Sequence, residues 1–230
     1  MTQQVLITGA NRGIGLMLTG LYCKADWEVI ACCREPANAK ALMALLEQYE
    51  GLEVFELDVT DYDAVEALAD ELGSRPIDLL LNNAGYYGPK EVAFGNTEVD
   101  EWRQVFEINC IAPMKLCEAF YPQLAMAKGI IANVSSMMGS MGDNQGGGAY
   151  LYRSSKAALN SVTKSLALDL APAGIKAVAL HPGWVQTDMG GPNALINTET
   201  SAKGLMQVIA HLSDSQNGHL VDYQGRILPW

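Results

Sequence analysis

One predicted helix carries two side chains with the spacing of an acid–base pair. Tyr152 and Lys156 are four residues apart, so on a helix they lie on one face. A free phenol has a pKa of about 10 and is a poor acid or base near neutral pH, but a neighbouring ammonium favours the phenolate and lowers that pKa. Lowering the pKa of the phenol by about three units corresponds to about 4 kcal/mol of differential stabilisation. Lys156 need not supply all of it. Tyr150 has Ser154 four residues on, so Tyr152 is the candidate acid, although the spacing alone also fits an ordinary amphipathic helix.

A glycine-rich loop near the start of the chain has the composition of a phosphate-binding turn. The segment Thr8–Gly15 reads TGANRGIG, with its glycines spaced G-x-x-x-G-x-G. Glycines let the backbone turn sharply and approach a pyrophosphate, whose charge then lies at the N-terminus of the following helix. The loop follows the first predicted strand, which is where a dinucleotide-binding turn belongs. We therefore expect cofactor contacts from Gly9, Asn11, Arg12, Gly13, Ile14 and Gly15.

The end of the second predicted strand indicates which dinucleotide is bound. An NAD site places Asp or Glu there to bind the ribose 2′-hydroxyl, whereas this chain has Cys33 followed by Arg34. With Arg12 in the glycine loop, two guanidinium groups are available for a 2′-phosphate. The sequence therefore favours NADPH (NADP⁺) over NADH. The alternative is that Arg34 is a solvated loop charge.

The elements that position these residues alternate along the chain. Short apolar runs predict strands at Val5–Thr8, Trp27–Cys32, Leu52–Leu57, Ile77–Leu81, Gly129–Val134, Ile175–Leu180 and His219–Val221. Helical patterns lie between them at Ile14–Lys24, Ala37–Tyr49, Ala64–Leu72, Glu98–Ala127, Tyr152–Leu170 and Thr200–Leu212. Nearly continuous apolar strands are covered on both faces. We predict one α/β domain over residues 1–230, a Rossmann-type, doubly wound, mostly parallel sheet of about seven strands with helices on both faces.

Composition limits the kinds of partner. The 230 residues are 49% hydrophobic and 18% charged, and 15 Lys and Arg against 26 Asp and Glu give a net charge of −11. This excludes a disordered chain. It also argues against nucleic acid or an anionic membrane as the main partner, because both need a basic surface.

The cysteines and histidines suggest neither disulfides nor a metal site. The five cysteines are odd in number and form no CxxC pair, and the three histidines are scattered. The first residues show no basic and apolar leader, and no apolar run approaches the about 20 residues of a membrane helix. We expect a cytoplasmic protein with reduced thiols and no metal.

Five motifs in order identify a family resemblance. Besides Thr8–Gly15, they are Asn82–Gly85 (NNAG), Asn109, Ser135–Ser136 and Tyr152–Lys156 (YRSSK). Each follows the appropriate strand or lies on the appropriate helix. Together they resemble the short-chain dehydrogenase/reductase family over essentially the whole chain.

The resemblance implies roles for four catalytic residues. Tyr152 corresponds to the tyrosine that protonates a carbonyl oxygen as hydride arrives from nicotinamide C4. Lys156 corresponds to the lysine that also holds the nicotinamide ribose, Ser136 to the serine that hydrogen-bonds the carbonyl, and Asn109 to the helix asparagine of a water-linked proton path. Ser135 competes with Ser136, but the family usually uses the second serine.

The resemblance also implies further cofactor contacts. Asp58 corresponds to an adenine-binding aspartate, and Asn83 to an asparagine that stabilises the backbone. In the segment 181–187, the main chain near Val185 would meet the carboxamide and Thr187 the pyrophosphate. The cofactor-binding residues expected on these grounds are Asp58, Val59, Asn83, Ala84, Gly85, Tyr152, Lys156, Pro182, Gly183, Val185 and Thr187, together with Arg34 and the glycine loop.

Several segments are similar to the C-factor/sniffer-type carbonyl reductase branch of the family. This similarity implies NADPH-dependent reduction of aldehydes or ketones. A short lid at 189–198 predicts an open pocket for largely apolar carbonyl compounds. Candidate pocket residues, for which core packing or a plain surface loop is the alternative, are Tyr86, Tyr87, Met137, Met138, Met141, Trp184 and the glycine-rich loop 139–148.

The sequence leaves two alternative functions open and suggests an oligomeric state. The chain could be a dinucleotide-bound signalling or regulatory protein of C-factor type, or an NADP-dependent alcohol dehydrogenase working in the oxidative direction. We also expect a homo-oligomer, a dimer rather than a tetramer, paired through the helices predicted at 98–127 and 152–170. Small residues there, Ala157, Ala158 and Ala167, permit close packing between subunits or within one.

Overall fold

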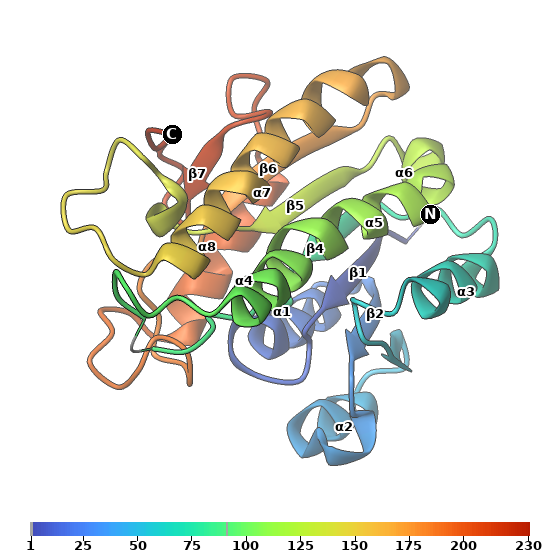
Figure 1. The fold of residues 1–230 in the computed structure, drawn as a ribbon. Helices are drawn as coiled ribbons and strands as arrows, with labels where there is room; N and C mark the ends of the chain where they lie inside the picture. The colour runs from blue at the N-terminus through green and yellow to red at the C-terminus, as the bar shows by residue number, and fades with distance from the viewer. Residues whose placement is uncertain (1, 91) are drawn as a thin grey trace.

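The computed structural model describes residues 2–90 and 92–230 and contains one seven-stranded, fully parallel sheet. The strands run in the spatial order β3-β2-β1-β4-β5-β6-β7 (Figure 1). Their bounds are β1 Gln4–Thr8, β2 Glu28–Cys33, β3 Leu52–Glu56, β4 Leu79–Asn82, β5 Ile130–Val134, β6 Lys176–His181 and β7 Leu220–Asp222. The order reverses between β1 and β4, so the carboxyl ends of these two strands flank the switch point where ligands bind in such sheets.

Helices cover both faces of the sheet (Figure 1). Their bounds are α1 Gly13–Lys24, α2 Lys40–Leu46, α3 Tyr62–Leu72, α4 Val99–Phe106, α5 Ala112–Ala119, α6 Tyr121–Ala127, α7 Tyr150–Asp169 and α8 Thr198–Ala210. Alternate residues of a strand point to opposite faces, so Val5 and Ile7 of β1 join the core under α1 and α8, while Leu6 joins the core under α5 and α7. The doubly wound fold predicted from the sequence is confirmed.

Each predicted strand lies within two residues of an observed one, but two helix predictions are wrong in part. The helix expected at 37–49 is confined to α2, after a 3₁₀ turn at Pro36–Asn38. The single helix expected at 98–127 is divided into α4, a π-helical turn at Glu107–Ile111, α5 and α6. Pro113 and Pro122 lie in the first turns of α5 and α6, and neither has an N–H to continue the helical hydrogen bonds of the turn before it.

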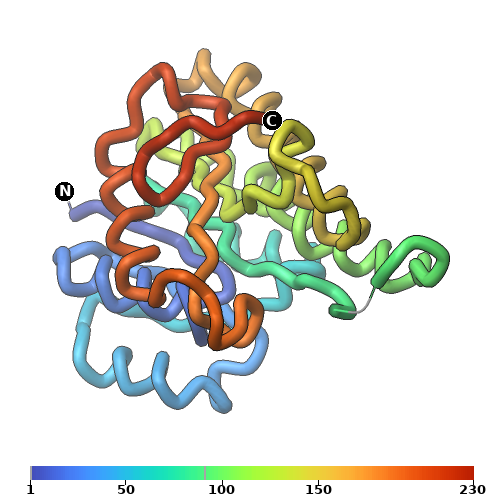
Figure 2. The backbone as a smooth tube through the Cα atoms, turned by 90° about the vertical axis from the view of Figure 1, so that its left-hand side faces the viewer, coloured from blue at the N-terminus to red at the C-terminus, as the bar shows by residue number. Residues whose placement is uncertain are grey.

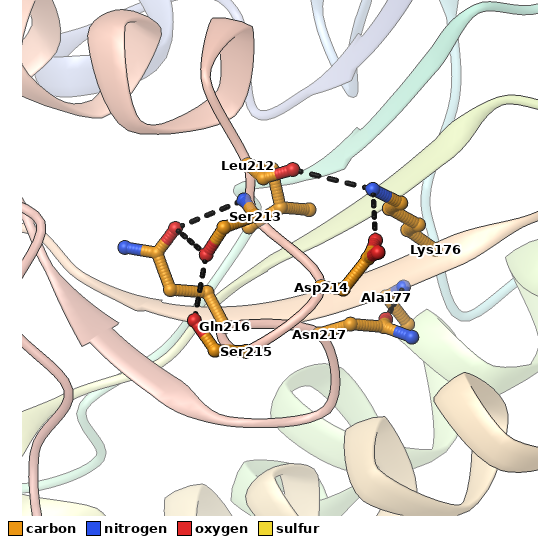
Figure 3. Close-up of polar contacts among 8 residues, drawn as sticks. All are labelled: Lys176, Ala177, Leu212, Ser213, Asp214, Ser215, Gln216 and Asn217. Atoms are coloured by element: carbon orange, nitrogen blue, oxygen red, sulfur yellow. Dashed lines mark hydrogen bonds and ion pairs between the residues drawn. The ribbon is translucent and has the colours of Figure 1, made fainter.

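The loop between α8 and β7 is fastened to β6 by side chains (Figure 3). Lys176 donates to the carbonyl of Leu212 at 3.3 Å and pairs with Asp214 at 2.8 Å, while the amide oxygen of Asn217 accepts from the N–H of Ala177 at 2.9 Å. These contacts hold the edge strand β7 in register, so that His181 of β6 lies opposite Asp222.

The end of the chain lies beside the glycine-rich loop that precedes α7 (Figure 2). Gly142 donates its N–H to the carbonyl of Trp230 at 2.7 Å, and the Trp230 ring stacks on His219. Within the described part of the chain, no helix has both the length and the apolar character that crossing a bilayer requires.

Candidate active site

A cleft of about 1230 Å³ lies at the carboxyl ends of the strands. It brings together most of the residues predicted to bind a dinucleotide, although they are spread over the whole chain. The predicted residues that line it are Gly9, Asn11, Arg12, Gly13, Ile14, Arg34, Asp58, Val59, Asn83, Ala84, Gly85, Tyr152, Lys156, Pro182 and Thr187. Gly15, Gly183 and Val185 do not line it, and neither do two of the predicted catalytic residues, Asn109 and Ser136.

The N-terminus of α1 has the properties of a phosphate site. Arg12 is the N-cap residue, its side chain makes no capping hydrogen bond, and no acidic residue lies in the first turn. The first backbone N–H groups of a helix have no partner within the helix, and their positive partial charge attracts an anion. The residues at this end of the cleft therefore fit a pyrophosphate.

Two glycines of this loop are required by close backbone approach. A Cβ at Gly9, which has φ +65°, would lie 2.9 Å from the Cα of Ala84, and a Cβ at Gly15 would lie 2.3 Å from the carbonyl oxygen of Gly9. Asn83 fixes the same loop by donating to the carbonyls of Thr8 at 2.9 Å and Gly9 at 3.1 Å. This geometry supports the expected backbone-stabilising role of Asn83.

The end of β2 has neutral and cationic side chains where an NAD site has a carboxylate. Cys33 and Arg34 follow one another at the end of β2, and both line the cleft with Arg12. The guanidinium of Arg12 pairs with Asp188 at 3.1 Å, with both side chains exposed. Arg12 is therefore accessible to an anion that competes with Asp188.

Asp58 has a fixed side chain in the turn after β3. Its Oδ1 accepts from the N–H of Thr60 at 3.0 Å and from the Thr60 hydroxyl at 2.8 Å. The carboxylate is held by the turn after β3, and Asp58 and Val59 together form part of the wall.

Tyr152 is buried on the first turns of α7 and faces the cleft. Burial raises its pKa to about 12, while a hydrogen bond with the Ser136 hydroxyl acts in the opposite direction. The lower pKa expected from the nearby Lys156 ammonium is not found, because the cost of burying a phenolate exceeds the gain from the neighbouring groups. A raised pKa keeps the phenol protonated at neutral pH, which is the state a proton donor needs. Tyr150 is exposed instead.

Lys156 lies under Tyr152 with its ammonium turned toward the sheet. Its Nζ donates to the carbonyl of Val134 at 2.8 Å and lies 5.7 Å from the centre of the Tyr152 ring. Burial lowers the pKa of Lys156 to about 8, with the nearby Cys110 thiol acting in the opposite direction. Lys156 is thus mostly cationic at neutral pH and can stabilise negative charge on Tyr152.

The two adjacent serines after β5 have different partners. The hydroxyl of Ser135 donates to Asn160 Oδ1 at 2.6 Å and is buried. The side chain of Ser136 lowers the pKa of Tyr152, and its hydroxyl accepts from the N–H of Met138 at 3.1 Å. Ser136 is therefore the serine that interacts with Tyr152, whereas Ser135 is the one that lines the cleft.

Asn109 lies in the π-helical turn and is fully buried. Its amide donates to the carbonyl of Tyr86 at 2.7 Å and to Ser155 at 3.0 Å, and its Oδ1 accepts from the N–H of Tyr86 at 2.9 Å. The side chain thus ties the segment after β4 to α7. Pro113 cannot donate to the Asn109 carbonyl, so this carbonyl lacks its usual helical partner.

The turn after β6 forms the wall of the cleft opposite the glycine loop. Gly183 has φ +86°, and a Cβ there would lie 2.7 Å from Ile196. Val185 is buried and forms a bridge with Ile196. Thr187 accepts from the N–H of Gly190 at 3.1 Å and faces Gly13 across the cleft. Pro182, Gly183 and Val185 therefore shape the wall, and Thr187 faces the cleft itself.

Few of the candidate substrate-pocket residues lie in the cleft wall. Tyr86 lines the cleft, whereas Met141 and Trp184 are exposed but do not line it. The Tyr87 ring packs on that of Tyr152 at 4.6 Å between centres.

Comparison with known proteins agrees with this geometry. Residues 3–195 match the family model described as short chain dehydrogenase. C-signal of Myxococcus xanthus is 42% identical over 167 residues, which are 72% of this chain and 100% of that protein. The structure of carbonyl reductase Sniffer of D. melanogaster superposes with a TM-score of 0.95 at 35% identity, over 100% of both chains. NADPH-bound carbonyl reductase from chicken fatty liver superposes with a TM-score of 0.93 at 35% identity, over 100% of this chain and 99% of that one.

The chain belongs to the short-chain dehydrogenase family. It is a short-chain oxidoreductase, and the predicted similarity to the C-factor/sniffer-type branch is confirmed by the matches to C-signal and Sniffer.

Sequence reasoning missed several residues of this short-chain oxidoreductase site. Gln104, Ile108 and Asp188 also line the cleft. Ile108 precedes the family asparagine and Asp188 follows Thr187, so proximity to a motif was an available signal. His181, interpreted as one of three scattered histidines, contacts the segment that carries Ser136, and only the fold shows this.

Proposed function

We propose that the protein reduces aldehyde or ketone carbonyls to alcohols with NADPH, and that Tyr152 is the general acid. The observation that carries this proposal is the convergence of a protonated Tyr152, its partner Ser136 and the buried cation of Lys156 beside the uncapped N-terminus of α1. NADPH is favoured over NADH by Arg12, Arg34 and Cys33 in the cleft wall, and the chicken carbonyl reductase is described as NADPH-bound.

In this mechanism each side chain acts on a defined atom. NADPH, when bound, supplies the hydride. The hydroxyls of Ser136 and Tyr152 hold the carbonyl oxygen, and Tyr152 gives that oxygen its proton. The Lys156 ammonium stabilises the phenolate that is left. The turn around Thr187, the α1 N-terminus and the arginines would hold the cofactor. The segment at Asn109 provides the expected route for reprotonation through water.

The proposal is tested by following NADPH and NADH absorbance with purified protein and a panel of aldehydes, ketones and diketones. We expect faster oxidation of NADPH than of NADH with at least one carbonyl. Tyr152→Phe should lower kcat by about 10²–10⁴-fold, the usual contribution of a general acid, and leave NADPH binding largely intact. Tyr150→Phe is the matched control and should keep its activity, because Tyr150 is exposed. A fully active Tyr152→Phe variant contradicts the proposal.

A second candidate function follows from the match to C-signal. A dinucleotide-bound signalling protein would need the cofactor cleft but not the Ser136–Tyr152 pair. Binding of a partner protein only when NADPH is present, with no turnover of any carbonyl, would favour it. The oxidative direction remains a third candidate, because one site catalyses both directions; the ratio of forward to reverse rates decides it.

We also propose a homodimer through the outer faces of α5 and α7. Ile111, in the π-helical turn directly before α5, and Leu168 of α7 are exposed apolar side chains. Ala167 is buried and packs on Gly218, so it serves the core and not an interface. Light scattering that finds a 24.8 kDa species at micromolar concentration contradicts the dimer.

A further inference from the structure

His181 is joined to the residue that follows Ser136. The Nδ1 atom of His181, at the end of β6, accepts a hydrogen bond from the N–H of Met137 at 3.1 Å, across 44 residues of sequence. A backbone N–H can only donate, so Nδ1 must carry the lone pair and Nε2 the proton. The doubly protonated imidazolium has no lone pair and cannot make this bond.

The surroundings keep this imidazole neutral. Burial lowers the pKa of His181 to about 4. The carboxylates of Asp222 and Asp143 act in the opposite direction, and Arg226 acts with burial. Asp222 is itself paired with Arg226 at 2.6 Å, which limits its pull on the imidazole.

The turn that begins at Ser136 is held by hydrogen bonds from α7 on one side and from the end of β6 on the other. On the α7 side, Asn160 donates to the Gly139 carbonyl at 3.3 Å and Arg153 donates to the Met138 carbonyl at 3.3 Å. A Cβ at Gly139 would lie 2.8 Å from the backbone of Lys156. On the β6 side, His181 makes the bond to the residue next to Ser136.

We propose that His181 is a positioning residue, whose neutral imidazole holds the Met137 N–H and thereby sets the Ser136 hydroxyl against Tyr152. The consequence for turnover rests on the carbonyl reduction proposed above. Displacement of a positioned group by about 1 Å can lower the rate about 100-fold. Ser136 directly precedes Met137, so a shift of the Met137 N–H moves the Ser136 backbone with it.

Two variants separate this role from simple packing. In His181→Asn, the side-chain Oδ1 lies near the former position of Nδ1 and can accept the hydrogen bond from Met137. In His181→Leu, the side chain fills a similar volume but has no acceptor. We expect His181→Leu to lower kcat for carbonyl reduction about 10- to 100-fold with little change in the NADPH Kd, and His181→Asn to restore most of it. His211→Leu is the control, because His211 is exposed and its Nδ1 lies 3.0 Å from the Gln207 carbonyl of α8.

Structural readouts keep this test independent of turnover. Crystal structures should show a longer Ser136–Tyr152 hydroxyl distance in His181→Leu than in the wild type or His181→Asn, and ¹⁵N NMR should show Nδ1 of His181 without a proton. Equal kcat in all three proteins, equal loss in both variants, an unmoved Ser136 or a protonated Nδ1 would each overturn the proposal. A wild type that reduces no carbonyl overturns the proposed function instead, and the crystal and NMR readouts then decide the role of His181.

Discussion

The two ends of the cleft are built in different ways. At the dinucleotide end, the glycine loop and the α1 N-terminus are adjacent in sequence, and their fit to a phosphate depends on backbone conformation. At the catalytic end, the side chains are held by bonds between distant segments, such as Asn109 to Tyr86 and His181 to Met137. Damage to the first end should therefore act on cofactor binding and folding, and damage to the second on kcat.

The largest loss of stability is expected from a side chain added at Gly15, which lies against the backbone of Gly9. In Gly15→Val the new side chain would enter the space of the Gly9 carbonyl, which lies 2.3 Å from the Cβ position, and of Asn83 Nδ2, which lies 2.5 Å from it. We expect the free energy of unfolding to fall by about 3–5 kcal/mol and NADPH binding to be lost, measured by urea unfolding and by titration calorimetry. Gly146→Val is the control: no atom lies within 4 Å of its Cβ position, and we expect a change of about 0.5 kcal/mol or less.

Cofactor selectivity should depend on the arginines alone. Arg34→Ala removes a charge-assisted contact to a 2′-phosphate, worth about 1.5–3 kcal/mol. The Kd for NADPH should rise about 10- to 150-fold, while that for NADH stays constant. Arg103→Ala is the matched control, since Arg103 pairs with Asp100 on α4. Parallel losses for both dinucleotides would place Arg34 outside the phosphate site.

The catalytic end should respond to alkaline pH. The pKa of Lys156 is about 8, so its ammonium is present below that pH and lost above it, and with it the stabilisation of the Tyr152 phenolate. We expect kcat for reduction to fall about tenfold per pH unit above about pH 8. The arginine of Lys156→Arg stays cationic. This variant should therefore show no fall in kcat above pH 8, whatever its rate at lower pH. A level wild-type profile through pH 9 would contradict the assignment of this cation.

The smallest effect is expected at the exposed pair between the glycine loop and the turn after β6. Asp188→Asn frees Arg12 from its partner at 3.1 Å. An exposed ion pair is worth about 0.2–1 kcal/mol, so the NADPH Kd should fall by up to about fivefold. The same variant should leave kcat unchanged. A weaker NADPH affinity would show that Asp188 serves to orient Arg12.

The same contrast explains what could be predicted from the sequence. The strands, the glycine loop and the Tyr152–Lys156 pair are local patterns, and the structure has them where they were expected. The division of the helix at 98–127 depends on Pro113 and Pro122, whose effect the apolar pattern of this segment does not show. The raised pKa of Tyr152 depends on its burial in the folded protein. The His181–Met137 hydrogen bond depends on the ends of two strands that lie side by side only in the fold. No local sequence pattern predicts either feature.

Isotope transfer tests the central claim most directly. NADPH carrying deuterium at both C4 positions is incubated with the protein and a carbonyl compound from the panel, and the alcohol is analysed by mass spectrometry. We predict one deuterium on the carbinol carbon with the wild type and essentially no alcohol with Tyr152→Phe. Alcohol without deuterium, or equal amounts of labelled alcohol from both proteins, would contradict hydride transfer assisted by Tyr152.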